Sequence, residues 1–300
     1  MRRTTLLFAL SLLLLAPWPA VAQGDDDLRE ELLRRINAER REAGSPPLRL
    51  SAPLTRVAQG QAEEIGRRNS SRLEAGSPEV LHERMERAGY NAHAWTESVA
   101  ATPGGVDAVI RNWQRGDSQT FRRLLDPQYR DLGIGLGRVR GTPLYTFLYA
   151  IPQGAYFTRE TTGLRDVERV RAEILAAVNA ERKRAGAPPL RSNPLLDKAA
   201  QRHAQDMLAR GYFAHESLER KTVRERAREA AYDWRAIGEN IAEGQLSVAE
   251  VMRTWMNSPG HRRNILDPAF KELGVGLALG RSGSGYRVLW AQAFGTARKK

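Results

Sequence analysis

Apolar residues recur at helical spacing in the second half of the chain. They lie three, four and four positions apart, at Val167, Val170, Ile174 and Val178. This spacing places them on one face of a helix. Ala185-Gly186 and a proline pair at 188–189 follow, and glycine and proline are typical of the end of a helix. The pattern therefore predicts a helix with one buried face.

Two more helices are predicted after it. The first spans 195–210, and its buried face carries Leu196, Ala200, His203 and Met207. The second begins at Ser247-Val-Ala-Glu250, which has the sequence of a capping box. Its inner face carries Val248, Val251, Met252 and Trp255, and Ser258-Pro259-Gly260 ends it.

Two alternating stretches close this half of the chain. In 273–279 one face carries Leu273, Val275, Leu277 and Leu279. In 286–294 one face carries Tyr286, Val288, Trp290, Gln292 and Phe294. Alternation predicts strands, and the glycine-rich loop between them suits a hairpin. Helices followed by an antiparallel ribbon predict a layered α+β domain.

The first half of the chain repeats the second. Asn37-Ala38-Glu39-Arg40 matches Asn179-Ala180-Glu181-Arg182 at an offset of 142 residues, and both copies continue to Pro-Pro-Leu. Glu97 falls on Glu239 and Trp113 on Trp255 at the same offset. After a slip of one residue, LLDPQYRDLGIGLG matches ILDPAFKELGVGLA. Agreement over the whole unit indicates two copies of one fold.

The copies set the expected domain boundaries. We expect domains at 28–152 and 166–297, joined by a linker at 153–165 whose YFTRETTG stretch is polar and lacks apolar periodicity. Residues 1–22 have a charged start, a short apolar run and Ala20-Val21-Ala22, which is typical of a secretory signal cut before Gln23. The run is too short to span a bilayer, so the mature chain is expected to lack a transmembrane segment and to be secreted or periplasmic.

Composition narrows the chemistry. The chain has no cysteine, which excludes disulfides and thiolate chemistry and leaves His, Asp and Glu as metal ligands. The formal net charge of +12 favours anionic partners such as envelope polymers, phospholipid headgroups or acidic glycans. A basic surface that serves only solubility is the alternative. No basic run with interleaved aromatics and no zinc-finger spacing is present, so nucleic acid is not an expected partner.

The second copy resembles a known family. NAERKRAGAPPL, AQRHAQDM, YFAHES, GENIAEG, WMNSPGHRRNIL, ELGVGLA and WAQAFG occur in the order of the CAP superfamily, which includes the cysteine-rich secretory, antigen five and pathogenesis-related proteins. The likeness is greatest to its cysteine-free bacterial branch, and the first copy resembles the same family weakly. The resemblance implies two tandem α-β-α sandwich domains, each with a central cleft.

In that family two histidines and two acids line the cleft, and in some members they hold a divalent metal. By this resemblance, His215 matches the first histidine of the family and Glu239 matches one of its two acidic residues. Ser258 occupies the expected place of the second acid, and Ala269 that of the second histidine. His261, in SPGHRRN, is expected near the same cleft. With His215 and Glu239 it would give two imidazoles and a carboxylate, a set that suits zinc with an open position.

Other interpretations of these residues stay open. Glu239 and His215 could form a buried hydrogen-bonded pair that only ties loops together. His261 could fix its turn by bonding backbone carbonyls. His203 lies on an apolar helix face and is expected to be a packed core residue, like Trp255 and Trp290. Gln292 is expected to satisfy backbone groups near the cleft.

The first copy lacks the histidines of the second. At the constant offset Leu73 replaces His215 and Gln61 replaces His203. Thr120 or Phe121 replaces His261. Only the glutamate is kept, as Glu97. The first domain is therefore expected to be a copy without the cleft site. Its own histidines, His82 and His93, are expected to face solvent.

Three functions remain. The first is a secreted binding module for an anionic envelope polymer, a lipid or a protein. The second is a metal-dependent hydrolase, in which zinc at His215 and His261 would activate water and Glu239 would act as general base or third ligand. The third is a structural module without a working site.

Overall fold

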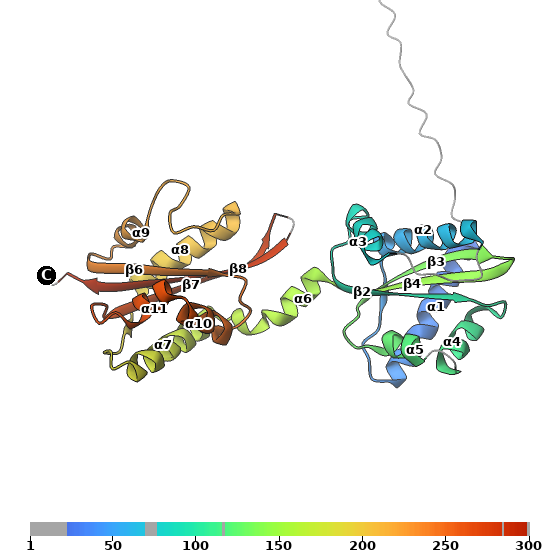
Figure 1. Ribbon diagram of the computed structural model, residues 1–300, viewed down its shortest axis with the longest axis horizontal. Helices are drawn as coiled ribbons and strands as arrows, with labels where there is room; N and C mark the ends of the chain where they lie inside the picture. Colours follow the sequence, from blue (N-terminus) through green and yellow to red (C-terminus); the bar gives the residue numbers. More distant parts are fainter. Residues whose placement is uncertain (1–22, 70–76, 116–117, 284, 299–300) are drawn as a thin grey trace, which may run out of the picture. The chain divides into compact units, whose positions relative to one another are not determined.

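The computed structural model describes residues 23–69, 77–115, 118–283 and 285–298. It divides into two compact units, Met1–Gln153 and Gly154–Lys300. Each unit contains one four-stranded sheet covered by helices (Figure 1). The predicted α+β class with two tandem sandwich domains is confirmed.

The first unit is a sheet of order β1-β3-β4-β2, in which β1 runs parallel to β3 and the other pairs are antiparallel. Its elements are α1 (Gln23–Glu42), β1 (Arg49–Leu50), α2 (Ala52–Arg68), α3 (Pro78–Arg87), β2 (Ala92–Ala101), α4 (Gly105–Arg115), α5 (Ser118–Leu125), β3 (Asp131–Val139) and β4 (Thr142–Pro152).

The second unit repeats this topology as β5-β7-β8-β6, again with the short strand parallel and the others antiparallel. Its elements are α6 (Gln153–Glu160), a 3₁₀ turn η1 (Thr162–Leu164), α7 (Val167–Arg184), β5 (Arg191–Ser192), α8 (Pro194–Arg210), α9 (Val223–Glu229), β6 (Trp234–Glu243), α10 (Val248–Asn257), α11 (Pro259–Leu266), β7 (Glu272–Ser282) and β8 (Gly285–Ala297). The same strand order in both units shows that the sequence repeat is a repeat of the fold.

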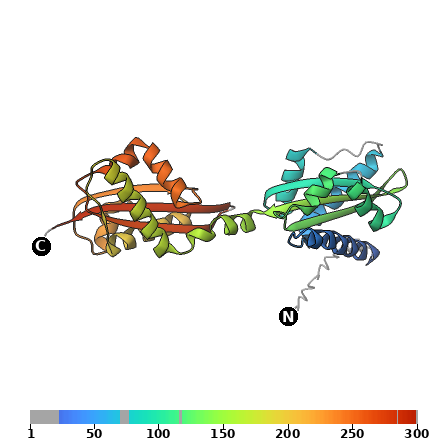
Figure 2. The ribbon, with the colours of Figure 1, turned by 90° about the horizontal axis from the view of Figure 1, so that it is seen from below.

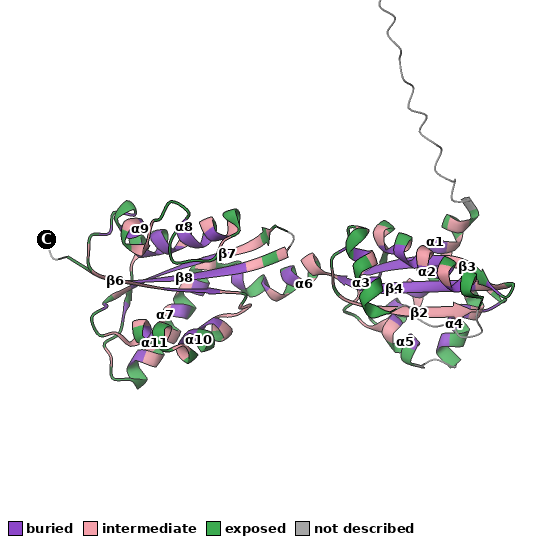
Figure 3. Cartoon of the chain, turned by 45° about the horizontal axis from the view of Figure 1, so that its top comes forward, coloured by how far each residue is buried: buried purple, intermediate pink, exposed green. Residues whose placement is uncertain are grey.

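The two faces of the sheet in the second unit are covered by different helices. On one face α8 packs on β7 and β8, and α9 adjoins α8. On the other face α7, α10 and α11 lie together, as Figure 2 shows from below. The strands between these layers are mostly buried, while the outer helix surfaces are exposed (Figure 3). The two faces of β7 and β8 belong to different core clusters, one with Val275 and Trp290 and one with Ala278 and Leu289.

The Gly-x-Gly sequence of β7 sets the distance between the sheet and α8. A Cβ atom on Gly274 would lie 2.1 Å from the backbone of Leu196, and one on Gly276 would lie 2.2 Å from the backbone of Ala200. Neither position can therefore carry a side chain without moving the helix. The first unit has the same contact, because a Cβ atom on Gly135 would lie 2.1 Å from the backbone of Ala58.

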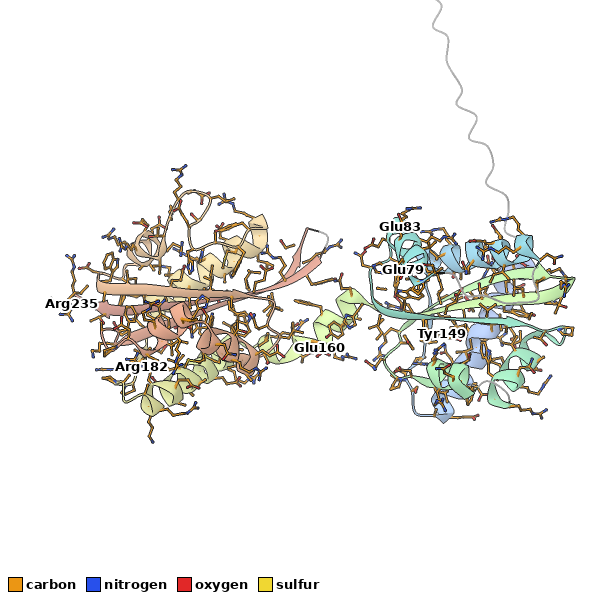
Figure 4. The ribbon with its side chains drawn as sticks, in the orientation of Figure 1. Glu79, Glu83, Tyr149, Glu160, Arg182 and Arg235 are labelled. Carbon is orange, nitrogen blue, oxygen red and sulfur yellow. The ribbon has the colours of Figure 1, made fainter. Side chains whose placement is uncertain are left out.

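The repeated Asn-Ala-Glu-Arg sequence also has a structural role. Asn179 exchanges two side-chain hydrogen bonds with the backbone of Leu190. Arg182, fully buried and labelled in Figure 4, donates to the backbone oxygens of Pro188, Ile265, Asp267 and Phe270. Arg40 makes the same four kinds of contact in the first unit. In each unit one guanidinium thus joins a long helix to the segment before a central strand. It joins α1 to the segment before β3 in the first unit, and α7 to the segment before β7 in the second.

The expected polar linker is a helix. Residues 153–160 form α6, and η1 follows at once. Phe157 and Leu164 are buried in the core of the second unit, and the Phe157 ring lies 4.8 Å from that of Tyr286. Two apolar residues seven positions apart give too weak a periodicity to stand out in a polar stretch. The segment at 153–164 is thus a helix followed by a 3₁₀ turn, and part of it packs in the second unit.

Two further predictions concerned a signal segment and the lack of a transmembrane segment. The predicted signal segment, residues 1–22, lies outside the described residues. None of the helices that the structure describes has the length and apolar character needed to cross a bilayer.

Candidate functional site

His215 lies in the loop between α8 and α9, opposite Glu239 on β6. The His215 Nδ1 atom lies 2.8 Å from Glu239 Oε2. The Glu239 side chain is only 5% exposed, whereas that of His215 is 59% exposed. A carboxylate oxygen accepts, so Nδ1 carries the hydrogen and Nε2 is left to interact with a ligand. The pair therefore presents an oriented imidazole at the surface.

Glu239 also has a second partner, Arg226 of α9. Its Nη2 atom donates to Glu239 Oε1 at 2.5 Å, and the Arg226 side chain is 8% exposed. Its Nη1 atom donates to the backbone oxygens of His215 and Lys221, at 3.1 and 2.5 Å. Arg226 thus neutralises the buried carboxylate and holds both ends of the loop that carries His215. The sequence analysis did not identify this residue.

His261 lies on α11 beside this pair. Its backbone oxygen accepts a hydrogen bond from Asn240, the residue after Glu239. Burial lowers the pKa of His261, and electrostatic repulsion from His215 lowers it further. Its Nδ1 atom is buried and has no hydrogen-bond partner among the described residues. His261 therefore does not fix its turn through Nδ1.

Ala269 is not at the cleft. Its backbone oxygen accepts a hydrogen bond from Thr296, which pairs with Ala236 at the start of β6. Glu239 lies three residues further along that strand. The resemblance gave Ala269 the place of the family's second histidine, and in this chain that place carries no imidazole.

A buried amide network lies next to Glu239 and His261. Asn240 donates to the Gln292 side chain and to the backbone oxygen of His261, both at 3.1 Å. Asn264 donates to Asn240 Oδ1 at 2.9 Å and to the backbone oxygen of Glu239 at 3.0 Å. These bonds tie β6, β8 and α11 together. Gln292 was expected to bond backbone groups, but its oxygen accepts from the Asn240 side chain.

The residues expected to pack in the core lie there. Trp255 and Trp290 are fully buried, and each indole N–H donates to a backbone oxygen, of Ile241 and Gln245 respectively. His203 is 1% exposed, and its Nε2 atom donates to the backbone oxygen of Ala214 at 3.0 Å. His203 thus anchors the loop before His215 to α8.

The donor set does not fit a divalent metal. Glu239 has one oxygen on a guanidinium and the other on the His215 N–H, so binding a cation would require replacing a buried arginine contact. Within the described ranges, no group of three or more His, Asp or Glu side chains is arranged to hold a metal ion. The predicted zinc site at His215, His261 and Glu239 therefore does not fit this arrangement.

The first unit has a different arrangement at the equivalent positions. Arg84, which matches Arg226 at the 142-residue offset, bonds Gln61 and Glu64 of α2. Thr120 is buried, and Leu73 lies outside the described residues. His82 and His93 are exposed, as expected. Gln61 and Thr120 stand where the second unit has His203 and His261.

Acid is expected to weaken the second unit through His203. Burial lowers the pKa of His203, and the negative charge of Glu239 opposes this only in part. The unfolded imidazole titrates at about 6.5. Below that pH the unfolded state therefore binds a proton that the folded state does not. Stability present above about pH 6.5 is lost as the pH falls toward and through the lowered folded-state pKa.

Thermal unfolding at about pH 7.5 and about pH 5 measures this loss. His203→Gln, which introduces the residue that the first copy carries, should reduce the pH dependence of the second unit's transition. An unchanged pH dependence in that variant would assign the effect to other groups.

Comparison with known proteins agrees with the geometry. Residues 33–149 and 175–294 each match the CAP family, described as the cysteine-rich secretory protein family. The Bacillus subtilis (strain 168) protein named "Uncharacterized protein YkwD" is 37% identical over 144 residues, which cover 48% of this chain and 54% of that protein. The "Uncharacterized membrane protein YlbC" of the same strain is 31% identical over 105 residues, which cover 35% of this chain and 30% of that protein. The chain thus spans about half of one relative and under a third of the other.

Among solved structures, an extracellular protein containing a SCP domain from Bacillus anthracis is similar with a TM-score of 0.40 and 23% identity, covering 55% of this chain and 60% of that one. The family match takes in most of both halves of the sequence and coincides with the two repeated sheets. The chain therefore belongs to the CAP family, the cysteine-rich secretory protein family, and contains two tandem copies of its domain.

Proposed function

We propose that the second unit is an extracellular binding module whose cleft at His215, Glu239 and His261 takes an anionic envelope polymer. One observation supports this most: a buried pair, Arg226 and Glu239, orients an imidazole that is itself mostly exposed. An imidazole that only tied loops together would not need an open ring edge. The extracellular location rests on the predicted signal segment.

The chemistry of the cleft favours a ligand with hydroxyl and anionic groups. His215 Nε2 can accept a hydrogen bond from a hydroxyl group. In the imidazolium form the same nitrogen can donate a hydrogen bond to an anion. Arg262 and Arg263 follow His261 on α11, are exposed and have no side-chain partner within the described ranges. Arg235 extends from the start of β6 into solvent (Figure 4). Such cations attract a polyanion over distances of about 10 Å at moderate salt.

The hydrolase alternative has less support. Its general base would be Glu239, but both oxygens of that carboxylate already accept hydrogen bonds from Arg226 and His215. A water molecule could still meet His215 Nε2, yet the described residues offer no second group that is shown to activate or receive it. Binding is therefore the function that the geometry supports best.

His215→Ala is expected to weaken binding of the full chain to purified bacterial cell wall that retains its anionic polymer. Loss of one hydrogen bond to a charged group is worth about 1.5–3 kcal/mol, or about a 10- to 100-fold loss of affinity. Co-sedimentation of the folded variant measures this. His82→Ala, which removes an exposed histidine from the first unit, is the matched control and should bind as the unchanged protein does.

The same assay separates the alternatives. Cell wall stripped of its anionic polymer should bind at least tenfold more weakly. Equal binding to stripped wall, or stronger binding to phosphatidylglycerol vesicles, would contradict the proposed ligand. A variant that binds normally but melts earlier would favour a structural module. Zinc that copurifies with the protein and is lost in His215→Ala would revive the metal-dependent hydrolase.

A further inference from the structure

A basic surface surrounds Trp234, where α9 packs on the start of β6. Arg224 and Arg228 lie one turn apart on α9, and their guanidinium carbons lie over the Trp234 ring, 5.8 and 5.0 Å from its centroid. Arg235 follows Trp234 on β6 and is exposed. We call these four residues the arginine–tryptophan patch.

The patch lies outside the cleft. Arg226 stands between Arg224 and Arg228 in the sequence, and positions two residues apart on a helix are rotated by about 200°. Arg226 therefore points to the opposite side of α9, where it bonds Glu239. The two arginines on either side of it belong to the outer surface of the domain.

Trp234 holds the two arginines of α9 in place. Its indole N–H donates to the backbone oxygen of Arg224 at 3.3 Å, which keeps the ring against the helix. A cation above an indole ring is attracted to it, and this attraction restricts the rotamers of a long side chain. A guanidinium whose face meets a ring keeps its N–H donors along its edge. Both groups are thus positioned before a ligand arrives, so less conformational freedom is lost when it binds.

The three arginines of the patch have no acidic partner within the described ranges, and all three are exposed. The neighbouring carboxylates have other partners. Glu229 bonds Lys221 at 2.6 Å, and Asp233 lies 3.8 Å from Arg298. Glu225 accepts hydrogen bonds at the N-terminus of α9 as part of a capping box. The positive charge of the patch is therefore not neutralised by ion pairs.

The first unit lacks this charge. Residues 220–235 contain six basic and three acidic residues, which gives a formal charge of +3. The matching residues 78–93 contain two basic and three acidic residues, which gives a formal charge of −1. Ala92 replaces Trp234 there, and none of the three arginines is kept. Because the two units share their strand order, the patch is not required by the fold.

We propose that the arginine–tryptophan patch binds the phosphate groups of a phosphodiester polymer of the cell envelope. This inference rests on the proposed function, because it names the anionic group of the ligand assigned to the cleft and gives that ligand a second contact.

The arrangement of the cations favours phosphate over carboxylate. A guanidinium binds either group through parallel N–H···O bonds. A carboxylate presents both oxygens in one plane and is filled side-on by one guanidinium, whereas the free oxygens of a phosphodiester diverge and accept from two. Arg224 and Arg228 share one ring and so offer two guanidinium groups to the same phosphate. Arg235 adds a third cation beside them.

Isothermal titration calorimetry of the full chain with poly(glycerol phosphate) tests this inference. The double variant Arg224→Gln, Arg228→Gln should bind about tenfold more weakly or worse. The slope of log Kd against log salt concentration should fall by about 1, because the contact with one phosphate is lost. The matched control is Arg191→Gln, Arg253→Gln, which removes two exposed arginines on β5 and α10, away from the patch. The control should keep both the affinity and the slope.

His215→Ala in the same titration separates this inference from the proposed function. Weaker binding of His215→Ala together with unchanged binding of the arginine double variant would overturn the patch and leave the cleft in place. Weaker binding of the double variant alone would support the patch and count against the cleft. If the unchanged protein does not bind poly(glycerol phosphate), the phosphate assignment is overturned, and the cell-wall assay still decides the function of the cleft.

Three further results would overturn the inference. Equal binding of polygalacturonate, a carboxylate polymer, would reduce the patch to a general charge effect. Tighter binding to phosphatidylglycerol vesicles would assign it to a lipid headgroup. Trp234→Leu, checked by thermal unfolding, keeps every charge and should weaken binding about threefold. Full affinity in that variant would remove the positioning role of the indole.

Discussion

Replacing Arg226 by methionine is expected to destabilise the second unit by about 3–5 kcal/mol, because removing one partner of a buried ion pair leaves the other charge uncompensated. The Arg226 and Glu239 side chains are both more than nine-tenths buried. The substitution also removes two bonds to the backbone of the His215 loop. Urea unfolding measured through tryptophan fluorescence should show an earlier transition, and binding to cell wall should fall with it.

The double variant Arg226→Met, Glu239→Gln is the informative control. It removes both buried charges, so it should be more stable than Arg226→Met alone. Arg84→Met in the first unit should cost less, because the Arg84 side chain is about a third exposed and its partner Glu64 can be solvated. The ion-pair argument fails if the double variant is no more stable than the single one.

Arg182→Met is expected to cost a similar amount, about 3–5 kcal/mol, through a different mechanism. Four backbone oxygens lose their donor at once, and a hydrogen bond to a charged group contributes about 1.5–3 kcal/mol. Two of these oxygens, of Asp267 and Phe270, lie in the segment after α11, which carries Phe270 into the core. We therefore expect the loop to detach from α7 and the second unit to unfold at lower denaturant concentration.

Arg40→Met gives the matched experiment in the first unit, where the contacts are the same. Each variant should shift the transition of its own unit, which differential scanning calorimetry can resolve. Arg182→Lys should recover little, because an ammonium group on a flexible stem cannot reach several carbonyls in the fixed directions that a guanidinium reaches. A wild-type transition in Arg182→Met would contradict this role.

The fold was largely predictable because its signals are local. Val170, Ile174 and Val178 form the buried stripe of α7, and Val275 and Trp290 lie on the predicted inner faces of their strands. The duplication then supplied the topology of the weaker copy. The helix at 153–160 was missed because Phe157 is buried by residues distant in the sequence, such as Tyr286, which local sequence does not reveal.

The site was only partly predictable. His215, Glu239 and His261 belong to recognisable motifs, but Arg226 lies in an arginine-rich run where composition does not reveal burial. A usable signal was present. When the two copies are aligned at the 142-residue offset, Arg226 matches another arginine, Arg84. The other arginines of the run match different residues: Arg220 matches Pro78, Arg224 matches His82 and Arg228 matches Glu86. An arginine kept in both copies of a changing run indicates a structural role, since Arg84 also binds two residues of α2.

The absence of side chains at Gly274 and Gly276 has a consequence for how the second unit can respond to a ligand. α8 lies against β7 with main chain on main chain, and a larger residue at either glycine would separate the two layers. This part of the domain therefore has little room to adjust. Adaptation to a ligand is expected instead in residues 211–222, the loop that α8 and α9 hold at either end.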